Sequence, residues 1–355
     1  MSFRARNSQT THISPCLRVS VRFSLCAFVP LCLCVMLLAS CLQTGRPVRA
    51  AEFALGTVCT VTLFDQGQNA RKSGVIFREI FSRIREIENL MSVNIPSSYV
   101  SRINAAAGIK PVQVHEDVFR VIKRALYFAE LSGGAFDPTI GPLVSLWGVS
   151  GDNPRVPSQA EIDEILPLIN WRNVELDDQQ RSVFLKHPGM AFDLGGIAKG
   201  FAAGEAAQIA KNAGVKRAII DLGGDIVTVG ERRDGNPWGV AIQNPLERRG
   251  SYIGILRVAA TTVVTSGISE RFFEKDGVRY HHIFCPFSGF PADSGLLSVT
   301  ITTANSMDAD ALSTAVFVLG FEKGKKLLEL FPGTEAVFIF DDFSVRTTPG
   351  INFTH

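Results

Sequence analysis

DLGGIAKGFAAGEAAQIAKNAG, at residues 193–214, is the stretch that decides how this chain can fold. It begins with an acid and two glycines, and it ends at Gly214, where a helix C-terminal glycine is expected. Between them, apolar side chains recur at the three- and four-residue spacing of a helix face: Ile197, Phe201, Ala202, Ala206 and Ile209. The stretch therefore predicts a tight turn followed by an amphipathic helix.

The turn ahead of this helix has the features of an anion-binding site. The Gly195-Gly196 pair lets the backbone turn tightly and approach a ligand closely. A helix directs its free N–H groups and the positive end of its dipole at the preceding turn. Lys199 adds a full positive charge. The alternative interpretation is that the two glycines serve only the packing of turn and helix.

The composition limits the class of protein. The chain has 355 residues, of which 46% are hydrophobic and 20% charged, enough for one large or two medium domains. Its formal net charge is +2, and the first forty residues hold four arginines and no acid. Removing those four leaves 32 basic against 34 acidic side chains. A near-neutral chain gives no electrostatic reason to expect nucleic-acid binding.

The N-terminus, residues 1–40, predicts an export signal. Two arginines precede an apolar run at residues 23–39, which is short for a membrane-spanning helix and is interrupted by Pro30. The run ends in Leu-Ala-Ser-Cys, which resembles a bacterial lipobox whose cysteine, here Cys41, is lipidated. We expect a lipid-anchored protein at the periplasmic face of the bacterial inner membrane. The alternatives are an ordinary cleaved signal or a single anchor helix.

The remaining boundaries follow from this interpretation. Residues 41–50 would form a short polar tether, and residues 51–355 the folded domain. Beyond Cys41, only Cys59 and Cys285 remain, too few for a disulfide framework. Whether these two cysteines pair is left open by the sequence.

Hydrophobic periodicity predicts an α+β fold, with mixed or antiparallel sheets flanked by helices. Helices are expected at residues 75–91, 118–131, 193–214, 308–319 and 322–331, with a short helix after the capping box of Ser158 and Glu161. Residues 135–148, rich in glycine and proline, are expected to form a shaped loop. Strands are expected at residues 56–64, 173–176, 182–186, 217–221, 238–243, 252–258, 261–267 and 297–303. Residues 279–291 are expected to form a strand that runs into a Gly/Pro loop, and residues 335–347 a hairpin.

Two further patterns suggest chemistry. Asp310 and Thr314 lie four residues apart on an expected helix, so they share a face and offer oxygen ligands that suit Mg²⁺. The alternative is that Asp308 or Asp310 caps that helix and Thr314 bonds its own backbone. His281 and His282 alternate along a strand, so at most one faces a site. Either histidine is an acid–base candidate or a satisfied core residue.

Six ordered blocks resemble one family, the FAD:protein FMN transferases, also called the ApbE or thiamine-biosynthesis lipoprotein family. The blocks cover nearly all of the chain after residue 50: AFDPTIGPLVSLWG at 135–148, DLGGIAKG at 193–200, DLGGD at 221–225, TSG at 265–267, RYHHIFCPFSGFP at 279–291 and DADALSTA at 308–315. The resemblance implies a two-lobed α+β fold that holds FAD between its lobes.

The resemblance also implies roles for particular residues. Mg²⁺ would bind the carbonyl of Gly196, the carboxylate of Asp310 and the hydroxyl of Thr314, and His282 would be the catalytic histidine. FAD would contact Leu55, Asn94, Ala135, Phe136, Asp137, Asp193, Lys199 and Phe284. A Thr or Ser hydroxyl of an exported flavoprotein, in a Ser-Gly-Ala-Thr-type motif, would attack the FMN-side phosphorus and release AMP. This chain has no obvious copy of that motif.

Two departures from the family pattern keep other functions open. Cys285 stands where the family commonly has the Asp of His-x-x-Asp-Pro. Asn94 stands where some relatives have a Tyr that would cover the flavin, so water could reach the site. The alternatives are therefore a Mg²⁺-dependent FAD pyrophosphatase that forms FMN and AMP, or a non-enzymatic periplasmic FAD-binding lipoprotein.

Overall fold

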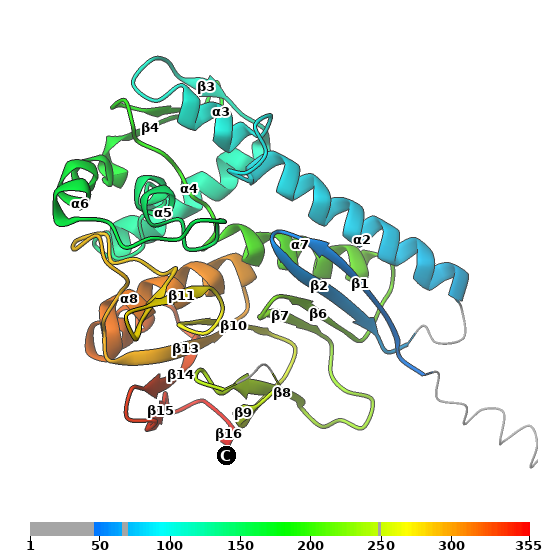
Figure 1. Ribbon diagram of the computed structural model, residues 1–355. Helices are drawn as coiled ribbons and strands as arrows, with labels where there is room; N and C mark the ends of the chain where they lie inside the picture. The colour runs from blue at the N-terminus through cyan, green and yellow to red at the C-terminus, as the bar shows by residue number, and fades with distance from the viewer. Residues whose placement is uncertain (1–45, 66–69, 248–249) are drawn as a thin grey trace, which may run out of the picture. The chain divides into compact units, whose positions relative to one another are not determined.

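An eight-stranded antiparallel sheet organises the fold in this computed structural model, which describes residues 46–65, 70–247 and 250–355 (Figure 1). Its strand order is β1-β2-β6-β7-β10-β13-β14-β15. The bounds are β1 Val48–Ala54, β2 Thr57–Leu63, β6 Ala218–Leu222, β7 Asp225–Val229, β10 Thr262–Gly267, β13 Leu296–Thr303, β14 Glu335–Phe340 and β15 Val345–Thr347. The predicted α+β class is confirmed.

Three helices lie on one side of this sheet. α7 (Ala198–Asn212) packs on β6 and β7, and α8 (Ser306–Leu328) packs on β10 and β13. α2 (Ala70–Met91) packs against α7 and β1 and buries a stripe of isoleucines at helical spacing. α8 breaks at Gly320, whose φ of 75° and ψ of 179° are not helical, so the two expected helices are confirmed as its two segments.

A smaller sheet covers the opposite side. Its order is β16-β9-β8, with β8 Trp238–Gln243, β9 Tyr252–Val258 and β16 Phe353–Thr354. Trp238, Val240 and Leu256 are buried with Val263 and Ile339 of the large sheet in a second hydrophobic core. The large sheet is therefore a middle layer between helices and a second sheet, so both its faces are apolar.

The remaining elements divide between two cores. They are α3 Tyr99–Ala105, α4 Glu116–Leu131, α5 Gly141–Trp147, α6 Gln159–Ile165, the 3-10 turns η1 Leu166–Leu168 and η2 Trp171–Asn173, the sheet of β3 Val112–Gln113, β5 Ser182–Leu185 and β4 Val174–Asp177, and the hairpin β11 Phe272–Lys275 with β12 Val278–His281. α3, α4 and the small sheet pack into the main hydrophobic core, and α5 and α6 build a third, separate one. Trp147 centres the third core and donates its indole N–H to the Gly289 carbonyl at 2.9 Å.

The structure differs from the sequence predictions at several places. The strand expected to contain both histidines is β12, which ends at His281, and β7 and β11 were not predicted. Residues 135–148 are not all loop, because residues 141–147 form α5. Pro142 lies in its first turn, where the N–H that proline lacks has no partner within the helix. Strand β1 begins at Val48, inside the expected tether, because it pairs with β2 along its whole length. Ser98 caps α3, which periodicity did not indicate. The capping box of Ser158 and Glu161 is confirmed.

The targeting predictions lie outside the described residues. The expected signal at residues 1–40, Cys41 and the first residues of the tether belong to that part of the chain. Within residues 46–65, 70–247 and 250–355, no helix has the length and apolarity needed to span a bilayer. Cys59 and Cys285 are both free thiols, which decides the pairing that the sequence left open.

Candidate active site

The Gly195-Gly196 turn is built by Asp193 and leads directly into α7. Asp193 Oδ1 accepts the N–H of Gly195 at 2.7 Å, and burial raises the pKa of the Asp193 carboxyl. α7 has no side-chain cap of its own at Ile197. Instead, Asp310 Oδ2 of α8 accepts the N–H of Gly200 at 2.9 Å. A carboxylate from a second helix therefore caps the start of α7.

Gly196, Asp310 and Thr314 come together at this contact of α7 with α8. Thr314 Oγ1 lies 3.2 Å from the point where a Cβ on Gly196 would stand, and the Asp310 Cβ lies 2.7 Å from the corresponding point on Gly200. Only glycine leaves room for such an approach. The helix α8 is capped by Asn305, which accepts the N–H groups of Met307 and Asp308. The alternative in which Asp310 caps its own helix is therefore wrong.

A buried ion pair completes the cluster. Lys199 Nζ lies 3.0 Å from both carboxylate oxygens of Asp225, and 3.6 Å from Asp310 Oδ1. Burial opposes the charged form of Lys199, but the two carboxylates outweigh it and raise its pKa. Burial, and then the negative charge of Asp310, raise the pKa of Asp225. Asp225 is 2% exposed. It is the last residue of the DLGGD block, and the sequence alone indicated no role for it.

The cluster suits a hard divalent cation. Its donors would be a carboxylate, a hydroxyl and a backbone carbonyl, all of them oxygens, as Mg²⁺ prefers. Asp225 and Asp310, both buried, face the partly buried ammonium of Lys199. Burial and the charge of Asp310 raise the pKa of Asp225, and a bound cation would favour its ionised form. The described ranges contain no group of three or more His, Cys, Asp and Glu that could hold a metal. A cation here would therefore complete its shell with substrate oxygens.

Two serines lie beside the Thr314 hydroxyl. Ser266 Oγ, at the end of β10, lies 2.8 Å from Ser313 Oγ and 3.5 Å from Thr314 Oγ1. Ser313 in turn donates to the carbonyl of Asp310 at 2.8 Å. Ser266 lies in the TSG block, but no local spacing connects it with α8, so the sequence alone indicates no function for it.

Of the two histidines, only His282 is available for chemistry. His281 is buried, with Nε2 3.1 Å from the Ala292 carbonyl, and it belongs to the core. His282 Nδ1 lies 3.2 Å from the Arg271 carbonyl, which only accepts, so Nδ1 carries the proton and Nε2 is free to accept one. Burial, and then the charge of Arg271, lower the pKa of His282 to about 3. The imidazole is neutral near pH 7.

The loop at residues 135–138 packs against the glycine turn. Phe136 Cε2 lies 3.2 Å from the Cβ position of Gly196, and the Pro138 carbonyl accepts the N–H of Asp193 at 2.9 Å. Ala135 and Phe136 are buried. Asp137 accepts hydrogen bonds from Thr139 and from the N–H of Trp171, and burial raises its pKa. Asp137 therefore holds the loop in shape.

The other residues expected to contact the flavin differ in their exposure and in their hydrogen bonds. Leu55, with a φ of 54°, donates its N–H to Glu88 at 2.8 Å in the turn between β1 and β2. Asn94 is exposed in the turn after α2, and its described hydrogen bond, to Ser92, stays within that turn. Phe284 is 5% exposed and packs on Trp147, so only its backbone can face a ligand.

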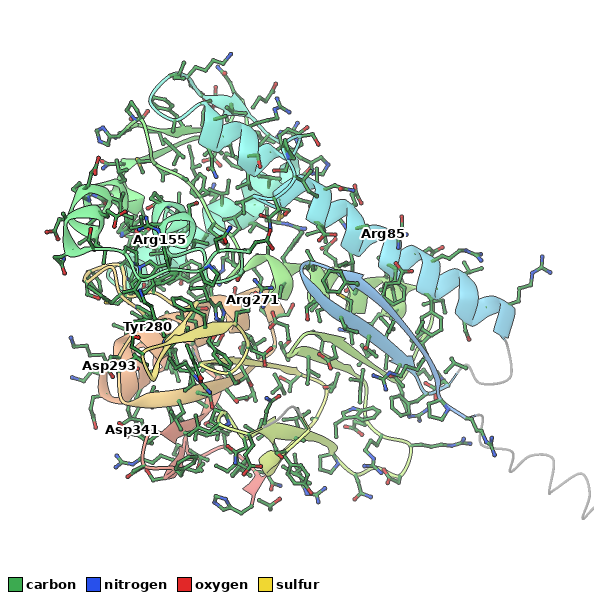
Figure 2. The ribbon with its side chains drawn as sticks, in the orientation of Figure 1. Arg85, Arg155, Arg271, Tyr280, Asp293 and Asp341 are labelled. Carbon is green, nitrogen blue, oxygen red and sulfur yellow. The ribbon has the colours of Figure 1, made fainter. Side chains whose placement is uncertain are left out.

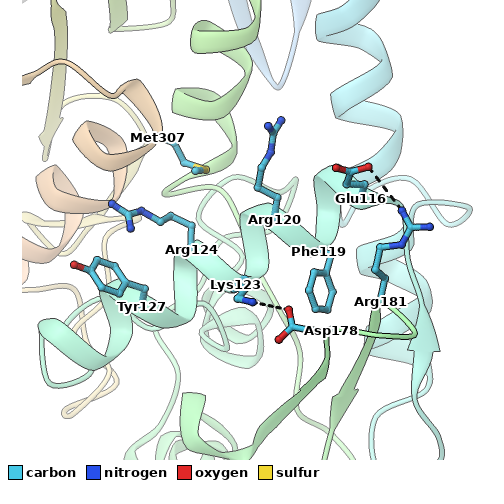
Figure 3. A pocket seen from close by; sticks show the side chains of 9 residues that line it. All are labelled: Glu116, Phe119, Arg120, Lys123, Arg124, Tyr127, Asp178, Arg181 and Met307. Atoms are coloured by element: carbon cyan, nitrogen blue, oxygen red, sulfur yellow. Dashed lines mark hydrogen bonds and ion pairs between the residues drawn. The ribbon is translucent and has the colours of Figure 1, made fainter.

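A pocket of about 730 Å³ lies along α4 and the first residues of α8 (Figure 3). Its cations are paired with acids: Lys123 with Asp178 at 2.5 Å, and Arg181 with Glu116 at 3.8 Å. Arg124 binds both oxygens of Asp308, at 2.8 and 2.7 Å, and so ties α4 to the start of α8. Neither Gly196, Asp310 nor Thr314 lines this pocket.

The sequence model of the ApbE family matches residues 55–338. The chain belongs to the ApbE family. The FAD:protein FMN transferase of Treponema pallidum is 39% identical over 319 residues, which are 86% of this chain and 88% of that protein. The FAD:protein FMN transferase of Klebsiella pneumoniae is 40% identical over 260 residues, 73% and 80% of the two chains.

Solved structures of ApbE proteins have the same fold. The ApbE protein of Thermotoga maritima is 36% identical with a TM-score of 0.78, over 86% of this chain and 97% of that one. The flavin transferase ApbE of Vibrio cholerae is 28% identical with a TM-score of 0.75, over 85% and 96%. The family resemblance and the ApbE-like fold are confirmed, and membership places this chain among enzymes.

Proposed function

We propose that this ApbE protein transfers FMN from FAD to a Thr or Ser hydroxyl of acceptor flavoproteins, with Mg²⁺ as cofactor and AMP as leaving group. The observation that carries the proposal is the meeting of the Gly196 turn with Asp310 and Thr314. Mg²⁺ held by these three residues would supply positive charge to the diphosphate of FAD. The N–H of Gly200, at the start of α7, holds Asp310 in place.

The reaction needs a base for the acceptor hydroxyl, and we assign that role to His282. Burial and the charge of Arg271 make it a weak base, and the negative diphosphate of bound FAD would raise its pKa again. Its free Nε2 takes the proton while the hydroxyl oxygen attacks the FMN-side phosphorus. A new phosphorus–oxygen bond forms, and the bond from that phosphorus to the bridging oxygen breaks. The bridging oxygen leaves with AMP, and FMN remains joined to the acceptor through its phosphate.

The test is an intact-mass measurement on an acceptor domain with a Ser-Gly-Ala-Thr-type motif. The acceptor is incubated with the purified protein, FAD and Mg²⁺, and an otherwise identical acceptor with its Thr replaced by Ala is the control. We expect the mass of one FMN on the first acceptor and none on the second. If no divalent metal supports covalent attachment, the transferase proposal is wrong.

One observation favours a second activity. Asn94 is small and exposed, and a Tyr at this position would offer the flavin a cover that Asn94 does not. Water entering there would take the place of the acceptor hydroxyl, and FAD would be hydrolysed to FMN and AMP. AMP release without acceptor should fall in Asn94→Tyr. Unchanged release would remove the reason for a pyrophosphatase, and tight FAD binding without any turnover would support a non-enzymatic flavin carrier.

We also place the protein at the periplasmic face of the bacterial inner membrane, held by a lipid on Cys41. The lipobox-like Leu-Ala-Ser-Cys after an apolar run supports this location, and exported flavoproteins would then be its acceptors. Cys41→Ala should shift the protein from the membrane fraction to the soluble fraction of cells. Equal membrane association of the two forms would contradict a lipid anchor at this cysteine.

A further inference from the structure

The two groups expected to bind phosphate are already engaged within the protein. Lys199 contacts both oxygens of Asp225 and faces Asp310. At the start of α7, the N–H of Ala198 is donated to the Leu194 carbonyl at 2.9 Å, and the N–H of Gly200 to Asp310. The diphosphate of a dinucleotide would therefore need another cation.

Arg271 is a cation of this region without an acid partner. Among the described parts of the chain, no carboxylate lies within 4.0 Å of its guanidinium. The side chain is exposed, and its described hydrogen bond is a long one, 3.4 Å from Nη2 to the Gly56 carbonyl. A guanidinium in this state can bind an anion without breaking an existing ion pair.

Arg271 also lies where the site segments meet (Figure 2). Its carbonyl accepts the N–H of His282 at 3.1 Å, so the proposed base is fixed to the Arg271 backbone. Its Nη2 lies 3.1 Å from the Cβ position of Gly56, in the turn that carries Leu55. Its positive charge lowers the pKa of His282 and opposes the rise in the pKa of Asp193, which places the charge beside both.

We propose that Arg271 binds the diphosphate of the flavin dinucleotide, an inference that rests on the proposed function. A planar guanidinium matches two phosphate oxygens at once, which a lysine ammonium does not. The same segment would then hold the phosphate and, through its backbone, the histidine that deprotonates the acceptor. Arg271 would discriminate FAD from flavins that lack phosphate.

Binding measurements on the full chain test this role without requiring turnover. The variants are Arg271→Gln, Arg271→Lys and the control Arg279→Gln, whose arginine lies on the β11–β12 hairpin and is paired with Glu274 at 3.0 Å. FAD and riboflavin binding are followed by flavin fluorescence and ADP binding by calorimetry, all in EDTA. Thermal unfolding of each variant reports whether it is folded.

We expect Arg271→Gln to weaken FAD and ADP binding about 10- to 100-fold and to leave riboflavin binding unchanged. Arg271→Lys should keep part of the affinity, and Arg279→Gln all of it. If Arg271→Gln does not fold, Arg271→Lys decides, since loss of the bidentate contact should still weaken ADP binding several-fold. Equal ADP affinity in the folded variants, or an equal loss for riboflavin, overturns the proposal.

The outcome separates this inference from the proposed function. Absence of FMN transfer, with an Arg271-dependent affinity for FAD and ADP, contradicts the transferase and supports the phosphate contact. Normal FMN transfer, with an affinity for FAD and ADP that is unchanged in Arg271→Gln, supports the transferase and contradicts the phosphate contact. A wild-type protein that binds neither FAD nor ADP, whether in EDTA or with Mg²⁺ added, contradicts both.

Discussion

Gly200→Ala tests whether the spacing of α7 and α8 positions Asp310. A Cβ on Gly200 would lie 2.2 Å from the Ser306 carbonyl oxygen and 2.7 Å from the Asp310 Cβ. Neither is the end of a flexible side chain, so the two helices have to separate by roughly 1 Å to reach normal contact distances. Gly204→Ala is the matched control on the same helix, because its Cβ would meet only the Ser306 hydroxyl, at 2.6 Å, which can rotate away.

The expected magnitudes follow from these contacts. In a helix, Ala is favoured over Gly by about 0.5–1 kcal/mol, a gain that both variants share. Overpacking at Gly200 costs about 1–3 kcal/mol, so Gly200→Ala should be unchanged or destabilised by up to about 2 kcal/mol. A displacement of about 1 Å in a catalytic arrangement can lower the rate about 100-fold. Gly204→Ala should gain about 0.5–1 kcal/mol of stability and retain its activity.

The assay compares FMN transfer rates at saturating FAD, together with the free energy of unfolding from urea titration. We expect Gly200→Ala to remain folded at the assay temperature and to lose about 100-fold in rate, with Gly204→Ala within about 2-fold of wild type. A folded Gly200→Ala protein with the wild-type rate would mean that the contact of Gly200 with Asp310 does not position the reacting groups.

Two other outcomes are expected. Asp310→Asn keeps a side chain that can accept the Gly200 N–H but removes the negative charge. The rate of FMN transfer should therefore fall at least about 100-fold, while the free energy of unfolding is little changed. An active Asp310→Asn enzyme would show that a metal is held elsewhere. Burial lowers the pKa of His281 to about 4. Since the unfolded chain then binds the proton more tightly, stability is full above about pH 6.5 and should fall by up to about 3 kcal/mol toward pH 4. Urea titrations at pH 7 and 5 check this, and His281→Asn should remove this share of the dependence while leaving the share of His282, whose pKa burial also lowers.

Local signals account for the elements that the sequence predicted well. α7 and the two segments of α8 follow from helical spacing and from Gly214 and Gly320, and the start of α6 follows from a capping box. β1 carries no clean alternation, because Glu52 and Phe53 at its end are both exposed, and only its pairing with β2 makes it a strand. Its existence depends on tertiary contacts that periodicity does not encode.

The site divides in the same way. The pairing of Asp310 with Thr314 was readable because four residues on a helix are one turn. Asp225 was not readable, since its place beside the cluster depends on the antiparallel register that sets it opposite Val264, two residues before Ser266. Arg271 reaches the site because the chain after β10 folds back to the turn at Gly56. Long-range pairing, which no local spacing reports, brings these residues in.

Asp310 can cap α7 and still bind a cation because the contacts divide between its two oxygens. Oδ2 takes the Gly200 N–H at 2.9 Å, whereas Oδ1 faces Lys199 at 3.6 Å, beyond a normal hydrogen bond. Lys199 is held instead by Asp225, at 3.0 Å to both oxygens. Oδ1 therefore has no described N–H or ammonium donor within hydrogen-bond distance, which leaves it the better placed of the two oxygens for a cation. Asp225 matters for this division, since without it Lys199 would be drawn to Asp310 and would compete with the metal for the same oxygen.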